Sequence, residues 1–268
     1  MLNSKPLNNL IYVDIETIPQ HSSFYKMSPI MQELFLKRFK REAEEMIGLI
    51  MDDWNIPSLN TPEWQPKLEK FYQNRGALQP ETAQICCISI GYFKTKIPVD
   101  LATLHLDQEL EFATKSFSGT DEIKILRDFY QACSSVLSKS INHTHHLVGF
   151  NSNVFDFPMI AKRMLINYLP LPPFFDVVDL KPWLREHWVD LKETYKFGVY
   201  DSNVSLAMLC ETFKIESPKA DIQGKDVSKV YYETGDTDRI ARYCNNDVKA
   251  TAELYLRLKG LKNKVVMV

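Results

Sequence analysis

Hydrophobic residues in this chain alternate between short β-branched runs and stretches at helical spacing. The runs that predict strands cover residues 10–16, 84–94, 109–117 and 146–150. The stretches with helical spacing cover residues 120–138, 158–167, 204–213 and 236–259. Strands that alternate with helices in this way predict an α/β fold, with a mixed β-sheet flanked by helices.

A stretch without strand character follows the first strand. The Ser28–Pro29 pair has the residue types of an N-cap and a first helical position. Apolar residues then recur at helical spacing through Met46 to Ile50, which predicts one continuous helix. The Thr61–Pro62 pair opens a second predicted helix, and Gly76 is placed to close it at C′.

These elements predict a single domain over residues 1–268, with a helical insertion over residues 20–80. The sequence contains no internal repeat and no low-complexity linker. An insertion placed after an acidic strand end acts either as a lid or as a stabilising subdomain, and the sequence leaves both roles open.

Composition excludes several classes of protein. The chain has 268 residues, of which 45% are hydrophobic and 25% charged, as in an ordinary globular protein. A formal net charge of −2 excludes a uniformly basic nucleic-acid coat but leaves room for a local basic groove. The 9 glycines are too widely spaced for either glycine-rich phosphate-binding loop, so contact with phosphate would need other groups.

The cysteines and the apolar runs indicate the cellular compartment of the protein. The 5 cysteines include no C-x-x-C pair, which predicts reduced thiols that fill the core. No apolar run approaches the length of a membrane span, and the N-terminal residues lack the pattern of a secretory signal. We therefore expect a cytoplasmic protein without a membrane segment.

The first acidic motif lies at the end of the first predicted strand. Asp14 and Glu16 are two residues apart, so both side chains point to the same side of the sheet. A second D-x-E, at Asp107 and Glu109, lies in a polar connection and is expected to face water. The pair at the strand end is therefore the candidate site.

Two further acidic motifs follow. Asp156 lies at a strand-to-helix turn, where it either serves a site or only caps the helix that contains Pro158. Tyr243 and Asp247 are four residues apart in the last predicted helix, so they share one face. The alternative for Tyr243 is a partly buried tyrosine that only bonds to its helix neighbour.

The ordered series D-I-E-T, N-x-x-x-F-D-x-P and Y-x-x-x-D resembles the 3′–5′ exonucleases of the DnaQ-like (DEDD) superfamily. Within it, the chain is similar to the predicted exonucleases related to the proofreading domain of family B DNA polymerases. The matching segments are residues 12–19, 149–163 and 219–255, about a quarter of the chain. Tyr243 indicates the tyrosine branch (DEDDy), because Arg242 stands where the histidine branch has its histidine.

The resemblance implies a ribonuclease H-like fold and a two-metal hydrolysis of phosphodiester bonds. Asp14, Glu16, Asp156 and Asp247 would hold two Mg²⁺ or Mn²⁺ ions, and Tyr243 would orient the attacking water. Carboxylates gathered this closely repel one another, and their oxygen atoms are the ligands that these ions prefer. A tyrosine has too high an ordinary pKa to be an effective base at neutral pH.

The resemblance also indicates how the substrate is bound. Thr17 and Asn151 match positions that contact the terminal nucleotide in relatives. A basic track for a frayed 3′ end would come from exposed cations, and the alternative for each is an ordinary solvated charge. The candidates are Lys162, Arg163, Arg239, Arg242 and Lys249.

Three functions remain open at this stage. The first is a 3′–5′ exonuclease acting on single-stranded DNA ends, with any polymerase or repair partner acting in trans. The second is an RNA exonuclease of the same class, because the sequence does not show how the 2′-hydroxyl is treated. The third is a catalytically silent nucleic-acid-binding adaptor, which retention of all four carboxylates disfavours.

Overall fold

The structure is a computed structural model, and the residues it describes form two compact units. The described residues are 5–48, 59–94, 109–138, 145–175, 187–199, 203–216 and 221–268. Unit 1 consists of Met1–Glu16, Ile85–Gln223 and Asp236–Val268, and unit 2 of Thr17–Gln84 and Gly224–Gly235. The whole stretch from 20 to 80 therefore belongs to unit 2, whereas the four candidate carboxylates belong to unit 1.

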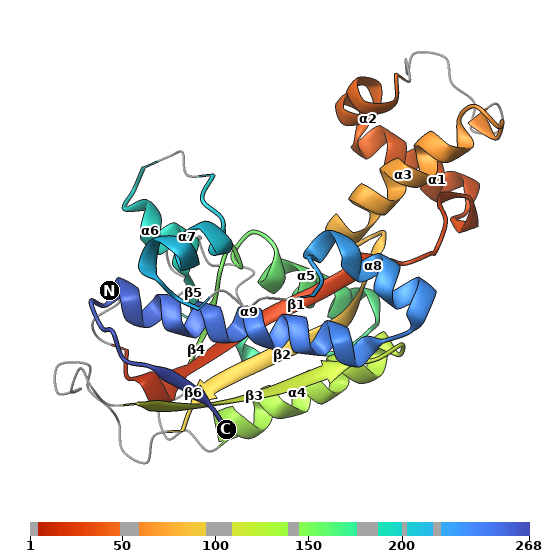
Figure 1. The fold of residues 1–268 in the computed structure, drawn as a ribbon. Coiled ribbons are helices and arrows are strands. Elements are labelled where there is room, and N and C mark those ends of the chain that lie inside the picture. The colour runs from red at the N-terminus through yellow and green to blue at the C-terminus, as the bar shows by residue number, and fades with distance from the viewer. Residues whose placement is uncertain are drawn as a thin grey trace. The chain divides into compact units, whose positions relative to one another are not determined.

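The described strands form one six-stranded sheet in the order β5-β4-β1-β2-β3-β6 (Figure 1). Their bounds are β1 (Leu10–Pro19), β2 (Ala83–Phe93), β3 (Leu110–Ser118), β4 (His146–Gly149), β5 (Trp188–Asp190) and β6 (Val265–Met267). Strand β4 pairs parallel with both β1 and β5, and β3 pairs parallel with β6, whereas β2 and β3 are antiparallel. This arrangement confirms the predicted mixed sheet.

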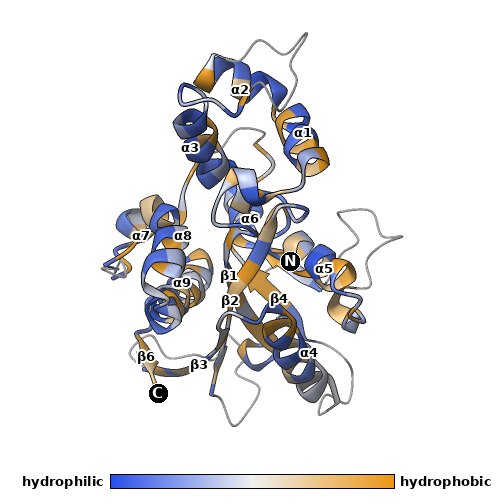
Figure 2. Cartoon of the chain, turned by 90° about the vertical axis from the view of Figure 1, so that its right-hand side faces the viewer, coloured by the Kyte–Doolittle hydropathy of each residue, from blue (hydrophilic) through white to orange (hydrophobic). Residues whose placement is uncertain are grey.

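Helices of unit 1 cover both faces of this sheet. Their bounds are α4 (Glu122–Ser138), α5 (Asp156–Ile166), α6 (Leu191–Lys196), α7 (Leu206–Phe213) and α9 (Thr237–Leu258). Figure 2 shows α9 on one side of the apolar strands and α4 and α5 on the other. The helices predicted at 120–138, 158–167, 204–213 and 236–259 are therefore confirmed to within two residues at either end.

Aromatic side chains pack α9 onto the sheet. The ring of Tyr12 in β1 contacts those of Phe112 and Tyr255 edge to face, with centroids 5.6 and 5.9 Å apart. Gly91 in β2 permits this close approach, because a Cβ there would lie 2.4 Å from Phe112 Cζ and 2.6 Å from Val248 Cγ1. This packing sets the position of α9 along β1, and with it the place of Tyr243 and Asp247.

Unit 2 contains the helices α1 (Pro29–Arg38), α2 (Lys40–Ile47), α3 (Gln65–Arg75) and α8 (Val227–Lys229). The helical insertion after the first strand is thus confirmed. Ser28 caps α1 as predicted, its hydroxyl oxygen accepting from Met31 N at 3.2 Å. A cluster of buried aromatic and aliphatic side chains, including Phe35 and Phe71, forms the core of this unit.

Two details of the predicted insertion are wrong. The predicted continuous helix breaks at Phe39, whose backbone leaves helical angles (φ −108°, ψ 26°), and the ring packs against Phe35 and Phe71. The break changes the helical phase, so Met46 is 51% exposed. Gly76 does not adopt a left-handed C′ conformation (φ −62°); its lack of a side chain makes room for the Tyr72 ring.

The two shortest strands had no sequence prediction. β5 and β6 have three residues each, too few for a hydrophobic pattern to be read. All five cysteines are buried, as expected for core thiols. None of the helices among the described residues is both long and apolar enough to cross a membrane.

Candidate active site

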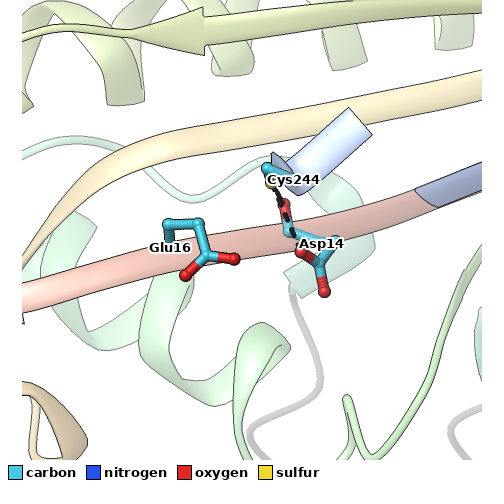
Figure 3. Close-up of side chains that lie close together, drawn as sticks. All are labelled: Asp14, Glu16 and Cys244. Atoms are coloured by element: carbon cyan, nitrogen blue, oxygen red, sulfur yellow. Dashed lines mark hydrogen bonds between the residues drawn. The ribbon is translucent and has the colours of Figure 1, made fainter. Parts of the chain in front are cut away.

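Asp14 and Glu16 lie side by side within β1 (Figure 3), and not at its end as predicted, because the strand continues to Pro19. The alternation of side chains along a strand places both on one side of the sheet, as the sequence predicts. Glu16 is buried, while Asp14 is partly exposed. A carboxylate oxygen from each residue and the sulfur of Cys244 all lie within 4.8 Å of one another, so these side chains could ligate a common cation.

Cys244 is a member of the site that the sequence did not identify. Its thiol, on α9, donates to the backbone oxygen of Asp14 and to Asp14 Oδ2, both at 3.3 Å (Figure 3). Cys244 lies in the apolar stripe of α9 between Ile240 and Val248, so the pattern predicts core packing there. Only the position of α9 over β1 shows that this stripe reaches a carboxylate.

Asp156 is the first residue of α5, and its side chain reaches β1. Its Oδ1 accepts from Ile15 N at 3.3 Å, between the two acidic residues of the strand. The alternative that Asp156 only caps its helix is wrong, because Phe155 occupies the N-cap position and no side-chain cap bond forms there. The third carboxylate is therefore joined directly to the backbone of the first pair.

Tyr243 and Asp247 lie on one face of α9, as their spacing predicts. The phenol donates a hydrogen bond to the Asp247 carboxylate, and both side chains are half-buried. Asp247 in turn raises the pKa of Asp14 and Glu16, so it lies close to the carboxylates of β1. The three motifs, from a strand, a strand-to-helix turn and a helix, thus converge on one cluster.

Burial raises the pKa of every carboxyl group in this cluster, and repulsion from other carboxylates adds to the rise for Asp14, Glu16 and Asp156. For Asp14 and Glu16 burial contributes most, and the neighbouring carboxylates raise each pKa further. Burial raises the pKa of Asp156 to about 7 and that of Asp247 to about 6. Among the described residues, no lysine or arginine is one of the groups that shift these four values most.

A buried set of like charges needs either protons or a cation. Carboxylate oxygens are the ligands that Mg²⁺ and Mn²⁺ prefer, and within the described part of the chain no lysine or arginine is a main influence on the pKa values of the set. The residues present therefore fit a divalent cation. Phosphodiester hydrolysis at paired metal ions is the chemistry that such a set of ligands supports.

A further buried carboxylate, that of Asp190, lies at the end of β5, and the sequence prediction did not include it. It accepts hydrogen bonds from the backbone amides of Asn151 and Asn153, both at 3.0 Å. It also caps α6 through the amides of Lys192 and Glu193. The D-x-x-E spacing of Asp190 and Glu193 is a capping-box signal that could have located this helix start, though not the contact with the turn.

The residues predicted to contact substrate lie in different settings. Asn151 is at the turn before α5 with a left-handed backbone (φ 60°), and Arg242 is exposed on α9 next to Tyr243. Thr17 belongs to unit 2, where its hydroxyl donates to Ala77 O at 2.8 Å. Their contacts with substrate stay predictions.

Arg163 is not available for substrate where the structure places it. Its guanidinium is 3% exposed and pairs with the buried carboxylate of Glu122, with Nε donating to Oε1 at 2.9 Å. The same carboxylate accepts from Ile85 N and Asn167 Nδ2. The sequence prediction of a substrate contact is therefore replaced by a structural ion pair that joins α4, α5 and β2.

The other candidates for a basic track divide into two groups. Arg239 pairs with Asp221 at 2.6 Å, and Lys249 pairs with Glu253 at 3.5 Å. Lys162, like Arg242, is exposed. The local basic surface among the described candidates is therefore smaller than the sequence predicts.

Comparison with known proteins agrees with this geometry. Residues 84–267 match the family described as predicted 3′–5′ exonucleases related to the exonuclease domain of PolB. The matched region includes Asp156, Tyr243 and Asp247, while Asp14 and Glu16 precede it. No curated protein matches the chain.

Among solved structures, the chain is similar to the family B DNA polymerase from the hyperthermophilic archaeon Pyrobaculum calidifontis. The TM-score is 0.52 at 16% identity, which shows a shared fold; the match covers 93% of this chain and 24% of the polymerase. The family match extends over more than half of the sequence. The chain therefore belongs to the family of predicted 3′–5′ exonucleases related to the exonuclease domain of PolB.

Proposed function

We propose that this protein is a metal-dependent 3′–5′ exonuclease that hydrolyses the terminal phosphodiester bond of single-stranded DNA. One observation carries the proposal: acidic residues from three distant parts of the chain form a single cluster, and among the described residues no lysine or arginine is a main influence on their pKa values. A cluster of this kind is destabilising by itself, so a role in binding cations accounts for it better than a role in packing. The family supports the same reaction.

The four carboxylates would hold two Mg²⁺ or Mn²⁺ ions. Asp14 lies close to both Glu16 on its own strand and Asp156 at the start of α5, since each raises its pKa, so it would supply oxygen atoms to both ions. Asp247 would complete the set from α9. When bound, the ions would activate water and stabilise the charge that develops on the leaving oxygen.

Tyr243 would position the attacking water rather than remove its proton. Burial and the nearby carboxylates raise the pKa of its phenol well above the ordinary value, so the group stays protonated at neutral pH. A protonated phenol that already donates to Asp247 has oxygen lone pairs left to accept a hydrogen bond from water. This arrangement would orient the water beside the carboxylate cluster.

The substrate would enter as a frayed single-stranded 3′ end. Asn151 and Thr17 would contact the terminal nucleotide, and Arg242 would contact the phosphate backbone from the exposed side of α9. A polymerase or repair factor acting in trans would supply such ends. Binding through so few cations predicts a shallow dependence on salt concentration.

The test is a digestion of end-labelled oligonucleotides, DNA and RNA, each labelled at either the 3′ or the 5′ end, with Mg²⁺ or Mn²⁺. We expect 5′-labelled single-stranded DNA to give a descending ladder, and 3′-labelled DNA to release mononucleotide at once. Asp14→Ala should abolish the ladder. Asp238→Ala removes an exposed carboxylate of α9 and should leave it intact.

Each other result has a defined meaning. Faster digestion of RNA would change the substrate but keep the reaction. If Asp14→Ala still gives a ladder, the carboxylate cluster is not the catalytic site. A folded protein that gives no ladder on any substrate would favour a silent nucleic-acid-binding adaptor.

A further inference from the structure

We propose that Asp190 is a positioning residue for this exonuclease site, holding the turn between β4 and α5 that carries Asn151 and leads into Asp156. The proposal rests on the function proposed above. Asp190 is outside the four-carboxylate cluster and has no part in the resemblance to the exonuclease motifs. Its side chain is 4% exposed, so its bonds are made inside the protein.

A single carboxylate links two separate segments of chain. Oδ2 accepts from Asn153 N at 3.0 Å, and Oδ1 accepts from Asn151 N, also at 3.0 Å. Oδ1 further accepts from Lys192 N at 2.9 Å and from Glu193 N at 3.3 Å, at the start of α6. Four amides directed at one buried carboxylate are charge-assisted donors, and each would be left unpaired without it.

The fold brings these segments together at neighbouring strand ends. β4 and β5 pair in parallel with Gly149 opposite Asp190, so the turn leaves the sheet beside the carboxylate. Space there is tight, because a Cβ on Gly149 would lie 2.6 Å from Ser152 Cβ and 3.2 Å from the Val13 carbonyl oxygen. The turn is therefore held between the backbone of β1 and the side chain at the end of β5.

The turn leads directly to the third site carboxylate. Asn151 adopts a left-handed backbone (φ 60°), and its carbonyl oxygen accepts from Phe155 N at 3.2 Å. Ser152 O accepts from Phe157 N at 3.0 Å, which begins α5. Asp156 then bonds to Ile15 N in β1. A change in how Asp190 holds the two amides would therefore shift Asp156 relative to Asp14 and Glu16.

The simpler reading is that Asp190 only caps α6. Ser205 provides the matched comparison, because it caps α7 by accepting from Met208 N at 3.2 Å. Removing the N-cap acceptor weakens the start of the helix in both places. Of the two capping residues, Asp190 alone also bonds to the turn before Asp156. If Asp190 positions the turn, its variants should lose more activity than their loss of stability explains, whereas a residue that only caps a helix should not.

The experiment compares Asp190→Asn, Asp190→Ala and Ser205→Ala in the full chain. In Asp190→Asn the amide oxygen can keep the bonds made by Oδ1, while its NH₂ group faces the Asn153 amide in place of an acceptor. We expect kcat on single-stranded DNA to fall roughly ten-fold to a hundred-fold with little change in KM. Ser205→Ala should keep the wild-type kcat after its small loss in melting temperature.

Hydrogen exchange gives a readout that does not depend on activity. We expect faster exchange at the amides of Asn151 and Asn153 in Asp190→Ala, faster exchange at Asn153 in Asp190→Asn, and no change at either in Ser205→Ala. Wild-type kcat in Asp190→Asn would overturn the positioning role while leaving the proposed function intact. Unchanged exchange in both Asp190 variants would also overturn it. An inactive wild-type protein with the expected exchange pattern would instead count against the proposed function.

Discussion

At the scale of single residues, two donors on α9 moderate an otherwise repulsive cluster. The Cys244 thiol donates to Asp14, and the Tyr243 phenol donates to Asp247. Neither donor carries a charge, so each can orient a carboxylate without competing with a cation for it. The two groups differ in what they predict, because the thiol is buried while the phenol is partly exposed, and its oxygen is the stronger hydrogen-bond acceptor for water.

Replacing Tyr243 by phenylalanine tests its role directly. The ring keeps its packing while the hydroxyl is lost, so we expect kcat to fall roughly ten-fold to a hundred-fold. The rise in melting temperature on adding Mn²⁺ should persist, because all four carboxylates remain. Equal activity of Tyr243→Phe and wild type would mean that the hydroxyl only bonds to its neighbour in the helix and has no part in the reaction.

Two arginines that look alike in the sequence should behave oppositely. Arg163→Ala leaves the buried Glu122 carboxylate without its ion pair, so we expect a loss of about 3–5 kcal/mol in the free energy of unfolding. Arg242 is exposed, so Arg242→Ala should keep the stability and raise KM for oligonucleotides. Chemical denaturation and steady-state kinetics measure the two effects. A stable Arg163→Ala variant with raised KM would restore Arg163 to the substrate path.

At the scale of elements, the site depends on how α9 lies against β1 and β2. The predicted bounds of α9, 236–259, are nearly those observed, Thr237–Leu258, because its apolar stripe is long and regular. Its position depends on a glycine in β2, Gly91, against which Val248 of the helix packs. The hydrophobic periodicity of the sequence does not reveal this contact. Gly91 is therefore the place to perturb the helix without touching the carboxylates.

We expect Gly91→Ala to destabilise the protein by about 1–3 kcal/mol, because the new methyl group would overlap Phe112 and Val248. The helix would have to move away from the sheet, so kcat should fall as well. Gly119→Ala is the control for side-chain volume, since its Cβ would meet nothing within 4 Å, although its positive φ adds local strain. Unfolding by urea gives the stability, and a wild-type value for Gly91→Ala would contradict this packing.

At the scale of the whole molecule, the carboxylate cluster links stability to pH and to metal. In the folded protein without metal the pKa of Asp156 is about 7, against an ordinary value of 3.8. Between these values the folded state binds more protons than the unfolded state. Stability contributed by this group is therefore present at low pH and is lost as the pH rises through about 7.

We expect this cluster to lower the melting temperature of the metal-free protein as the pH rises from 5 to 7.5. Asp156→Asn should make the melting temperature depend less on pH and should raise it at pH 7.5. Asp238→Asn should change neither the pH dependence nor the melting temperature. Saturating Mn²⁺ should restore stability at pH 7.5, because a cation replaces the protons. An identical slope in Asp156→Asn and wild type would show that the cluster is not the source.

The sequence was enough to predict the long helices of unit 1, the four longer strands and the residues of the three acidic motifs. These are local matters, since periodicity, capping residues and spacing along the chain are properties of neighbouring positions. It could not determine the strands of three residues, the break at Phe39 or the burial of Arg163, because each depends on partners distant in sequence.

The tertiary structure determines which of these groups meet. It placed the Cys244 thiol on Asp14, Asp156 on the amide of Ile15, and the carboxylate of Asp190 on the turn before α5. These contacts join residues between 39 and 230 positions apart. Side-chain type predicts what such groups can do, but packing across the sheet determines whether they come close enough to do it.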